Sequence, residues 1–444
     1  MRRDDTDSNQ PYRRWSVSRT ATRPPAWCDD PSMRILLTSR GSAGHLTPLT
    51  PFGHAALRAG HEVLVTAQRQ HAGNVERADL PFAPVDEPPP DQWMPLLAGF
   101  AQMDLDTSNA AMIGEYFARL DTAAALPRLR EVVEEWRPDV IVRECWEFAS
   151  TLVAELHDVP VVRVALGLAS LEELTIRLAA PALDAARAGL GLPADPAGDR
   201  LRDTPCFTAI PERLEDPSVP ASGHTQRFRH GVPTDAPPLP DWWPGNDDPL
   251  VYVTFGSVSA GPHLPYFPAL YRAAIGALAP LPVRVLLTIG DRRDHGELGP
   301  LPPNVHVEEW VPQDAVAPHA AAIVCHGGHG STLGAIGHGV PLVVVPLFSG
   351  DQWLNAAAVE RASAGIALDA ERDTRPVLGI PGPATVDALG PAVQRVLAEP
   401  IHRRGAQRLA ADMLALPPTD AAVDALAALS AAPRRAPSVS RERP

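Results

Sequence analysis

Short apolar runs alternate with amphipathic segments through most of the chain, beginning at the run MRILLTS, residues 33–39. Thr47 and Pro48 fit the N-cap and the first position of a helix that extends to Arg58. Gly60 suits the position just after that helix, and the apolar run HEVLVTA follows as the next strand. A strand, a helix and a second strand in this order predict a βαβ unit, and therefore a parallel sheet with right-handed crossovers.

The same alternation continues on both sides of a segment rich in proline and polar residues, 211–249. Before it, helix patterns and apolar runs follow in the order LPRLREVVEEW, PDVIVRE, FASTLVAELHD and VPVVRVA. After it, the strand patterns are LVYVTFGS, RVLLTIG, NVHVEEW, AAIVCHG and LVVVPL, with the helix patterns PALYRAAIGAL and STLGAIGHG between them. The sequence therefore predicts an α/β chain with two Rossmann-like parallel-sheet domains that face each other across a cleft, where ligands bind at the carboxyl ends of strands.

Shifts in composition set the expected domain boundaries. The second half of the proline-rich segment, residues 233–248, is the expected interdomain linker. It separates an N-terminal domain, 33–232, from a C-terminal domain, 249–430, whose last helices are candidates for packing back on the first domain. The N-terminal extension, residues 1–32, and the tail, 431–444, are low in apolar residues and are expected to be disordered.

The N-terminal extension lacks the apolar core of a signal peptide, so Met33 is a candidate translation start, and a genuine flexible arm is the alternative. No apolar run reaches the roughly 18 residues of a membrane-spanning helix, so no stable membrane insertion is expected. Without an export signal, the reducing cytoplasm is the expected location. A disulfide framework or a zinc ribbon is not expected because the cysteines form no CxxC pair. They are Cys28, Cys145, Cys206 and Cys325.

Length and charge narrow the class of partner. The chain has 444 residues, with 39 basic and 53 acidic side chains and a net charge of −14. This length suits two domains. An acidic chain lacks the basic surface that supplies affinity for nucleic acid, so no nucleic-acid partner is expected. An anionic ligand would have to be held by locally placed donors.

The stretch CHGGHGSTLGAIGHGVP, residues 325–341, holds three histidines and six glycines. It joins an apolar run to a helix pattern, so backbone N–H groups and a helix N-terminus could approach an anion such as a diphosphate. A Walker loop is excluded because Gly-Lys-Ser/Thr is absent, and the third glycine of a GxGxxG fingerprint is displaced to Gly334. A metal site using Cys325, His326 and His329 and a purely structural turn are the alternatives to an anion site.

The residues around this stretch raise its specificity. From Glu308 to Glu360 the order is Trp-Val-Pro-Gln, the loop HGGHGS, Gly-Val-Pro, and then Asp-Gln with a following Asn. This order resembles the nucleotide-sugar signature of glycosyltransferase family 1, which has the GT-B fold. The loop variant is more similar to bacterial antibiotic-tailoring members than to plant members. The resemblance extends over both expected domains, includes GHLTP as the family's GHxxP, and excludes both ends.

The resemblance implies a nucleotide-sugar donor site in the C-terminal domain. Trp310 would stack on the nucleobase, Gln313 would contact the nucleoside, and the glycine loop would hold the diphosphate. Asp351 and Gln352 would contact sugar hydroxyls, because a carboxylate accepts hydrogen bonds and an amide both donates and accepts them. A core aromatic for Trp310 and a solvated loop for Asp351 and Gln352 are the structural alternatives. The implied donor-binding residues are Ser257, Trp310, Val311, Gln313, His326, Gly328, Gly330, Ser331, Thr332, Asp351 and Gln352.

One departure from the family pattern bears on the nucleotide. Plant members carry a glutamate one turn into the helix, where it binds both ribose hydroxyls, and the ungapped match places Gly334 there. Without that carboxylate, a 2′-hydroxyl loses an acceptor. The co-substrate expected from this departure is a dTDP-sugar in preference to a UDP-sugar, and no other cofactor is expected.

Two residues of the N-terminal domain are candidates for the chemistry. His45 matches the family's catalytic histidine and would act as general base on the accepting hydroxyl, and a capping or structural loop histidine is the alternative. We expect it just ahead of a helix, whose N-terminus would keep the imidazole neutral. Glu144 ends the strand pattern PDVIVRE and would orient the histidine, with an ion pair to Arg143 or a solvated strand end as the alternatives.

No metal is expected, because the DxD spellings at 5–7 and 104–106 lie in the N-terminal extension and in the acceptor domain. The expected reaction is a direct displacement with inversion at the anomeric carbon. The predicted function is therefore an inverting, metal-independent glycosyltransferase of the hexosyltransferase type, as a monomer or a homodimer. The alternatives are a cell-envelope or other GT-B nucleotide-sugar enzyme, and a catalytically silent auxiliary protein that keeps the fold.

The acceptor pocket is expected within residues of about 82–125 and 165–235. An apolar lining that includes methionines suits a hydrophobic aglycone such as a polyketide or an aromatic natural product. The alternative is that many of these side chains are ordinary core. The candidate lining residues are Trp93, Met94, Phe100, Met103, Met112, Tyr116, Phe117 and Leu168.

Overall fold

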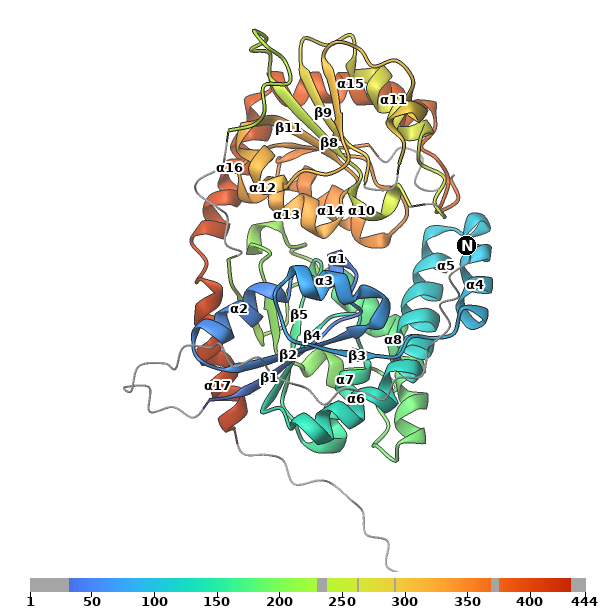
Figure 1. Cartoon of the computed structure of the whole chain (residues 1–444), viewed down its shortest axis with the longest axis vertical. Coiled ribbons are helices and arrows are strands. Elements are labelled where there is room, and N and C mark those ends of the chain that lie inside the picture. Colours follow the sequence, from blue (N-terminus) through green and yellow to red (C-terminus); the bar gives the residue numbers. More distant parts are fainter. Residues whose placement is uncertain (1–31, 230–237, 262, 291–292, 369–374, 433–444) are drawn as a thin grey trace, which may run out of the picture.

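The chain folds into two α/β halves, each built on a parallel sheet, and Figure 1 shows one half above the other along the long axis. The α/β class with two parallel sheets is confirmed. Nearly all of the two ends expected to be disordered, together with 230–237 around the start of the expected linker, lie outside the described residues. The computed structural model describes residues 32–229, 238–261, 263–290, 293–368 and 375–432.

The N-terminal half contains a seven-stranded parallel sheet in the order β3-β2-β1-β4-β5-β6-β7. In β1, Ile35 and Leu37 pack in one core and Leu36 packs in another, so the strand is buried on both faces. Burial on both faces explains why the strand sequences are continuous apolar runs. The strands are β1 (Arg34–Thr38), β2 (Glu62–Gln68), β3 (Phe82–Val85), β4 (Val140–Glu144), β5 (Val161–Val164), β6 (Cys206–Thr208) and β7 (Thr225–Arg227).

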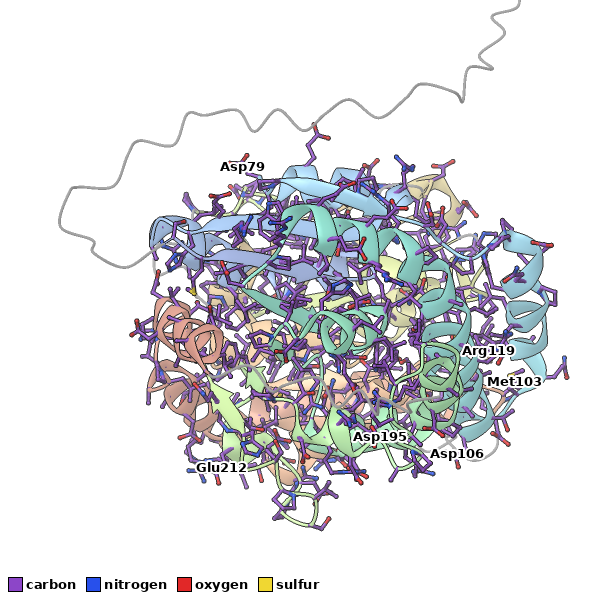
Figure 2. All side chains as sticks on the ribbon, turned by 90° about the horizontal axis from the view of Figure 1, so that it is seen from below. Asp79, Met103, Asp106, Arg119, Asp195 and Glu212 are labelled. Atoms are coloured by element: carbon purple, nitrogen blue, oxygen red, sulfur yellow. The ribbon has the colours of Figure 1, made fainter. Side chains whose placement is uncertain are left out.

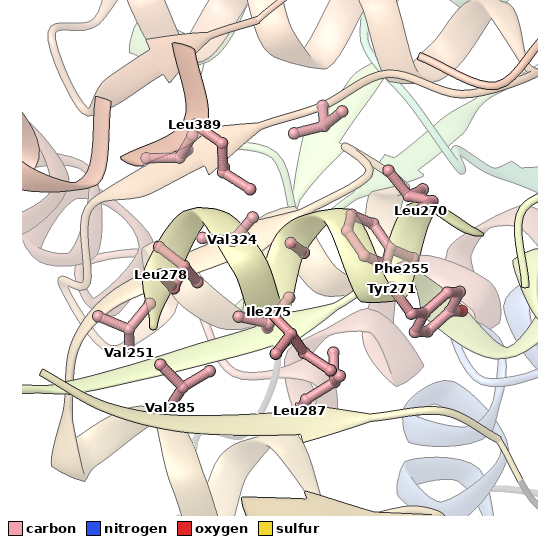
Figure 3. Close-up of a cluster of buried hydrophobic side chains, with 14 of the residues drawn as sticks. Val251, Phe255, Leu270, Tyr271, Ile275, Leu278, Val285, Leu287, Val324 and Leu389 are labelled. Atoms are coloured by element: carbon pink, nitrogen blue, oxygen red, sulfur yellow. The ribbon is translucent and has the colours of Figure 1, made fainter. Parts of the chain in front are cut away.

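The C-terminal half contains a six-stranded parallel sheet in the order β10-β9-β8-β11-β12-β13. Figure 3 shows part of its core, where Leu278 and Ile275 of one helix lie over Val251 and Val285 of the sheet. The strands are β8 (Leu250–Thr254), β9 (Arg284–Thr288), β10 (Val305–Glu308), β11 (Ala320–Cys325), β12 (Leu342–Val344) and β13 (Gly365–Ala367).

In both sheets the strand order reverses between two neighbouring strands, β1 and β4 in the first and β8 and β11 in the second. The loops that leave the carboxyl ends of such a pair diverge to opposite faces, which opens space for a ligand at the sheet edge. His45 lies in the short helix that follows β1, and Glu144 is the last residue of β4. The segments after β8 and β11 carry Ser257 and His326. The topology therefore places these four expected site residues at the two reversal points.

Helices connect the strands of both halves. Those of the N-terminal half are α1 (Ala43–Leu46), α2 (Thr50–Arg58), α3 (Ala72–Arg77), α4 (Pro90–Gly99), α5 (Leu105–Asn109), the π-helix η3 (Ala110–Asp121), α6 (Thr122–Trp136), α7 (Ala149–His157), α8 (Ala169–Gly189) and α9 (Asp199–Asp203). Those of the C-terminal half are α10 (Gly256–Ser259), α11 (Ala269–Leu278), α12 (Gln313–Val316), α13 (His329–Gly337), α14 (Gly350–Arg361), α15 (Pro383–Ala398), α16 (Pro400–Leu414) and α17 (Ala422–Ala431). Short 3₁₀ turns are η1 (Arg69–His71), η2 (Phe100–Gln102), η4 (Glu212–Leu214), η5 (His295–Leu298), η6 (Ala317–His319) and η7 (Thr419–Ala421).

The expected N-cap at Thr47 is wrong. Thr47 is the C-cap of the short helix α1, and α2 begins only at Thr50 with Leu49 as its N-cap. The reason is a second proline, since Pro51 lies in the first turn of α2, where a residue without an N–H group is tolerated. The end of the helix is as expected, at Arg58.

The two halves share packed residues. Leu168 and Ile210 of the N-terminal half lie in one hydrophobic cluster with residues of the C-terminal sheet. Trp243, within the expected linker, belongs to the same cluster. After α16 the chain returns to the N-terminal half, and Leu426 of α17 packs in the same cluster as Phe52 of α2. Within the described ranges, no helix combines the length and the apolar content needed to cross a bilayer.

The packing of α17 can be tested by shortening one side chain. Leu426 is 1% exposed in its cluster, so Leu426→Ala should lower the free energy of unfolding of the N-terminal half by about 3 kcal/mol. The matched control is Leu414→Ala at the end of α16, where the side chain is 68% exposed and the expected change is within about 0.5 kcal/mol. Urea unfolding followed by circular dichroism measures both. Equal shifts for the two variants would show that α17 is not docked.

Candidate active site

The loop after β11 places a histidine between two glycines. His326 follows the last residue of β11, and Gly256 follows the adjacent strand β8 after one residue. A methyl group at Gly256 would lie 2.6 Å from Cε1 of His326, and one at Gly328 would overlap Nε2 of the same ring. Gly256 also has a φ of +81°, which a residue with a side chain rarely adopts. The two glycines are therefore required for the imidazole to lie where it does.

The environment of His326 keeps it uncharged. The residue is 9% exposed, and burial lowers the pKa of its imidazole to about 4. Among the described residues, Nδ1 of this ring is buried without a hydrogen-bond partner. A buried polar atom of this kind requires a ligand or an ordered water. His326 is thus a neutral group at the edge of the glycine loop.

The helix that follows presents its N-terminus beside this histidine. The first bond within α13 joins the N–H of Thr332 to the carbonyl of Gly328 at 3.0 Å, so the preceding amides have no acceptor one turn back in the helix. Gly330 is exposed, and a methyl group there would meet nothing within 4 Å. Ser331 is partly exposed. This helix end, with its partial positive charge, is open to an anion.

Two residues of the same stretch face the interior. Thr332 is 1% exposed, and its hydroxyl lies beside the buried thiol of Cys325. Burial raises the pKa of that thiol to about 12, which disfavours the thiolate that binds metals. Within the described ranges, no three His, Cys, Asp or Glu side chains cluster so that they could hold a metal ion.

The expected base-stacking segment lies at the end of β10. Trp310 is 70% exposed, so it is not the core aromatic that was the alternative, whereas Val311 packs partly against the core. Gln313 begins α12, and its Nε2 donates to the carbonyl of Ser331 at 2.9 Å. A methyl group at Gly334 would lie 2.6 Å from that Nε2. Gly334 is therefore the position that lets Gln313 lie across the first turn of α13.

The Asp-Gln pair lies in the first turn of α14. Oε1 of Gln352 accepts the backbone N–H groups of Leu347 at 2.7 Å and Phe348 at 3.0 Å, which leaves its NH₂ group as the donor for a ligand. Burial raises the pKa of Asp351 to about 6, against the opposing effects of Ser349, the helix amides and His45. The effect of His45 means that this carboxyl group lies within electrostatic reach of the N-terminal half. Ser257, in α10, is exposed.

The N-terminal half brings His45 and Glu144 together. Nδ1 of His45 lies 2.9 Å from Oε1 of Glu144, whose side chain is fully buried while that of the histidine is 15% exposed. Burial acts to raise the pKa of Glu144, but the opposing effects of His45, the Trp146 N–H and Arg40 lower it overall. The carboxylate therefore stays ionised, and its hydrogen bond fixes the imidazole with Nε2 on the other side of the ring.

The expectation that His45 precedes a helix N-terminus is wrong, since it lies inside the short helix α1. Its charged neighbour is the carboxylate of Glu144 rather than a helix dipole. The alternative pairing of Glu144 with Arg143 is also not the arrangement in the structure. The Arg143 guanidinium instead donates to the carbonyls of Glu144 at 2.9 Å, Cys145 at 3.1 Å and Glu147 at 2.9 Å.

Aromatic rings extend from His45 into the region expected to bind the acceptor. The His45 ring lies 5.2 Å from that of Trp146, and Trp146 stacks on Phe117 at 5.5 Å. Tyr116 and Trp93 continue the series at centroid distances of 5.5 and 6.1 Å. Of the other candidate residues, Leu168 and Phe100 are buried, whereas Met94 is exposed. The apolar wall beside the histidine is thus built by Trp146 after β4 and by Phe117 and Tyr116 of the π-helix.

Comparisons with known proteins agree with this arrangement. Two family models match the chain, the erythromycin biosynthesis protein CIII-like N-terminal domain over residues 55–196 and the C-terminal domain of the same family over 272–429. The L-demethylnoviosyl transferase of Streptomyces niveus is 33% identical over 353 residues, which cover 77% of this chain and 86% of that protein. The chain belongs to this family of glycosyltransferases.

Other relatives support the same assignment. The elloramycin glycosyltransferase of Streptomyces olivaceus is 29% identical, over 88% of this glycosyltransferase and 96% of its own length. The structure of the glycosyltransferase SsfS6 of Streptomyces sp. SF2575, complexed with thymidine diphosphate, aligns with a TM-score of 0.69 at 26% identity, over 89% of this chain and 99% of that one. SnogD of Streptomyces nogalater has the same fold, with a TM-score of 0.70 at 24% identity over 90% of this chain and 100% of that one. The expected GT-B fold and enzyme class are confirmed.

Sequence reasoning missed two residues of this glycosyltransferase, Trp146 and Arg40, that lie next to the pair formed by His45 and Glu144. The backbone N–H of Trp146 donates to Oε2 of Glu144 at 2.6 Å, and its ring flanks His45. The Arg40 guanidinium lies 3.9 Å above the Phe117 ring and bonds Asp121 at 2.6 Å. Both residues come within two positions of the end of a strand at the sheet's reversal point, and that position was the available signal.

The buried state of His326 predicts a pH dependence of stability. Its pKa is about 4 in the folded chain, and the usual value is 6.5, so the unfolded chain binds the proton more readily between these pH values. Stability should therefore fall as pH drops from 6.5 toward 4, by up to about 3 kcal/mol from this one group. His326→Gln should remove this part of the dependence. Urea unfolding at pH 7, 5.5 and 4.5 measures it.

The control for this experiment is His224→Gln, at an exposed histidine, which reports the effect of losing a surface imidazole. The stability of wild type relative to His326→Gln should decline steadily with acidification. Curves that stay parallel at all three pH values would contradict a neutral buried His326.

Proposed function

We propose that this glycosyltransferase is an inverting, metal-independent enzyme that moves a sugar from a dTDP-sugar to a hydroxyl of a hydrophobic natural product. The observation that carries the proposal is the 2.9 Å bond between Nδ1 of His45 and Oε1 of Glu144 in the half opposite the glycine loop. It is the arrangement in which an imidazole acts as a general base, because the carboxylate holds Nδ1–H and leaves Nε2 as the acceptor.

In the proposed reaction, Nε2 of His45 takes the proton of the acceptor hydroxyl as its oxygen attacks the anomeric carbon. The bond from that carbon to the diphosphate oxygen breaks on the opposite side, so the configuration inverts. The imidazolium formed is stabilised by Glu144, whose lowered pKa keeps it charged. The departing negative charge is stabilised by the N-terminus of α13 and by a hydrogen bond from His326.

The nucleotide proposed is a thymidine diphosphate. A UDP-sugar needs an acceptor for its 2′-hydroxyl, and at Gly334 the chain has no side chain to supply one. The amide of Gln313 also lies against this position, so the space beside the first turn of α13 is already filled. Further support is the relative SsfS6, which is 26% identical and was solved complexed with thymidine diphosphate.

The acceptor proposed is an apolar, ring-containing molecule. The side chains next to His45 on this side are aromatic, those of Trp146, Phe117 and Tyr116, and stacking on such rings favours flat apolar ligands. The names of the relatives also point to tailoring of natural products, namely transfer of L-demethylnoviose and glycosylation in elloramycin formation. Asp351 and Gln352 are proposed to bind the sugar between the two halves.

The base assignment is tested by His45→Ala and Glu144→Gln. Loss of the base should lower kcat by at least about a hundredfold, while loss of the carboxylate should lower it by a smaller factor because the imidazole remains. Binding of dTDP, measured by calorimetry, should be unchanged in both. The control is His54→Gln, at a histidine whose Nε2 bonds the carbonyl of Ala78. Retention of normal kcat by His45→Ala would refute the assignment.

The nucleotide assignment is tested with matched donors. Turnover of dTDP-glucose and UDP-glucose is compared on a panel of hydrophobic phenols and polyketides, with products read by mass spectrometry. We expect kcat/KM to favour the dTDP donor by at least about tenfold, since an unpaired buried hydroxyl costs more than 1 kcal/mol. Faster turnover of the UDP donor would reject this assignment while leaving the glycosyltransferase class intact.

A further inference from the structure

A residue of the N-terminal half lies directly against the first residue of α14. Asn109 is the last residue of α5, and Gly350 is the first of α14. A methyl group at Gly350 would lie 2.8 Å from Nδ2 and 2.9 Å from Oδ1 of Asn109. Gly350 is buried, and a side chain at this position would have to displace the amide. The contact joins the acceptor half to the helix that carries Asp351 and Gln352.

The segment that carries Asn109 is fixed at both ends. Before α5, the carbonyl of Met103 accepts the N–H of Val377 from the C-terminal half at 2.9 Å. The side chain of Asp104 then caps α5 by accepting the N–H of Thr107 at 2.7 Å. After Asn109 the chain continues without a break into the π-helix that lines the acceptor side. Asn109 is therefore held beside Gly350 by the capped helix α5 before it and by the π-helix after it.

The side-chain amide of Asn109 has polar groups left over. No hydrogen-bond partner for its Oδ1 or Nδ2 is found among the described residues, and the residue is partly exposed. It does not cap α14 either, since that helix has Ser349 as N-cap and no side-chain cap bond. An amide in contact with a helix end that it does not cap is available to a ligand.

The nearest ligand groups belong to the proposed sugar site. Asp351 follows Gly350 directly, and its carboxyl group interacts electrostatically with His45. Asn109 thus contacts the residue next to Asp351, the carboxyl group that lies within electrostatic reach of His45. A sugar there presents hydroxyls that both donate and accept, and an amide offers one acceptor and two donors.

We propose that Asn109 binds a hydroxyl of the transferred sugar, so that the donor-sugar site is completed by the acceptor half. Its Nδ2–H donates to the hydroxyl oxygen, or its Oδ1 accepts the hydroxyl proton, beside Asp351 and Gln352. The inference rests on the proposed function. It makes Asn109 a specificity residue for the sugar and assigns it no part in binding the nucleotide.

The test compares the binding of dTDP with that of dTDP-glucose by calorimetry in wild type and Asn109→Ala. The variant should bind dTDP within about twofold of wild type and dTDP-glucose about tenfold more weakly, the effect of one hydrogen bond. Gly350→Ala, which pushes a methyl group into the Asn109 amide, should act in the same direction. Asp106→Ala on the same helix is the matched control, because that side chain is exposed and lies at the rim of the molecule in Figure 2.

Deoxy analogues of dTDP-glucose separate a sugar contact from a structural role. If Asn109 binds one hydroxyl, the tenfold penalty should disappear for the analogue that lacks this hydroxyl and persist for the others. A penalty that is equal for dTDP, dTDP-glucose and every analogue would show that Asn109 only supports the fold, and no penalty at all would also overturn the inference. Failure of the proposed function has a different signature, namely no transfer and no dTDP-sugar binding by wild type.

Discussion

The active site depends on keeping one buried carboxylate charged. The side chain of Glu144 is fully buried, and burial alone would raise its pKa and favour the protonated, neutral form. Three groups prevent this, the imidazole of His45, the N–H of Trp146 and the nearby Arg40. The turn after β4, which presents the N–H of Trp146, is held by Arg143, whose buried guanidinium bonds three of its carbonyls. The histidine's orientation is therefore a property of the whole reversal point of the first sheet.

The opposite half has a different task in the proposed function, because the groups proposed to hold the diphosphate include no positively charged side chain. Its means are a helix N-terminus, a neutral imidazole and glycines that leave space. Gly256 and Gly328 make room for His326, and Gly334 makes room for Gln313. Donors of this kind are preorganised and need no counter-ion when the site is empty. The net negative charge of the chain, −14, is for this reason compatible with the proposed binding of a diphosphate.

The two halves are not independent modules joined by a tether. Leu168 and Ile210 of the first half are buried with residues of the second, and α17 of the C-terminal segment packs on the first. Near the site, Met103 and Asn109 contact Val377 and Gly350. Because these contacts join the two halves at several places, their relative position is set by packing as well as by the linker.

Apolar runs and glycine spacing are local properties, and from them the sequence predicted the α/β class, the glycine loop and the strands β1, β2, β4, β5 and β8 to β12. It did not predict β3, β6, β7 and β13. The resemblance to the family made His45, Glu144 and Asp351 candidates for the site. The groups that surround them depend on the tertiary structure. It showed that Arg143 clamps a turn instead of pairing with Glu144. It explained the glycine at position 334, because Gln313, 21 positions away in sequence, packs against it. It also brought Asn109 against Gly350. Contacts between distant segments follow from packing, which no local pattern records.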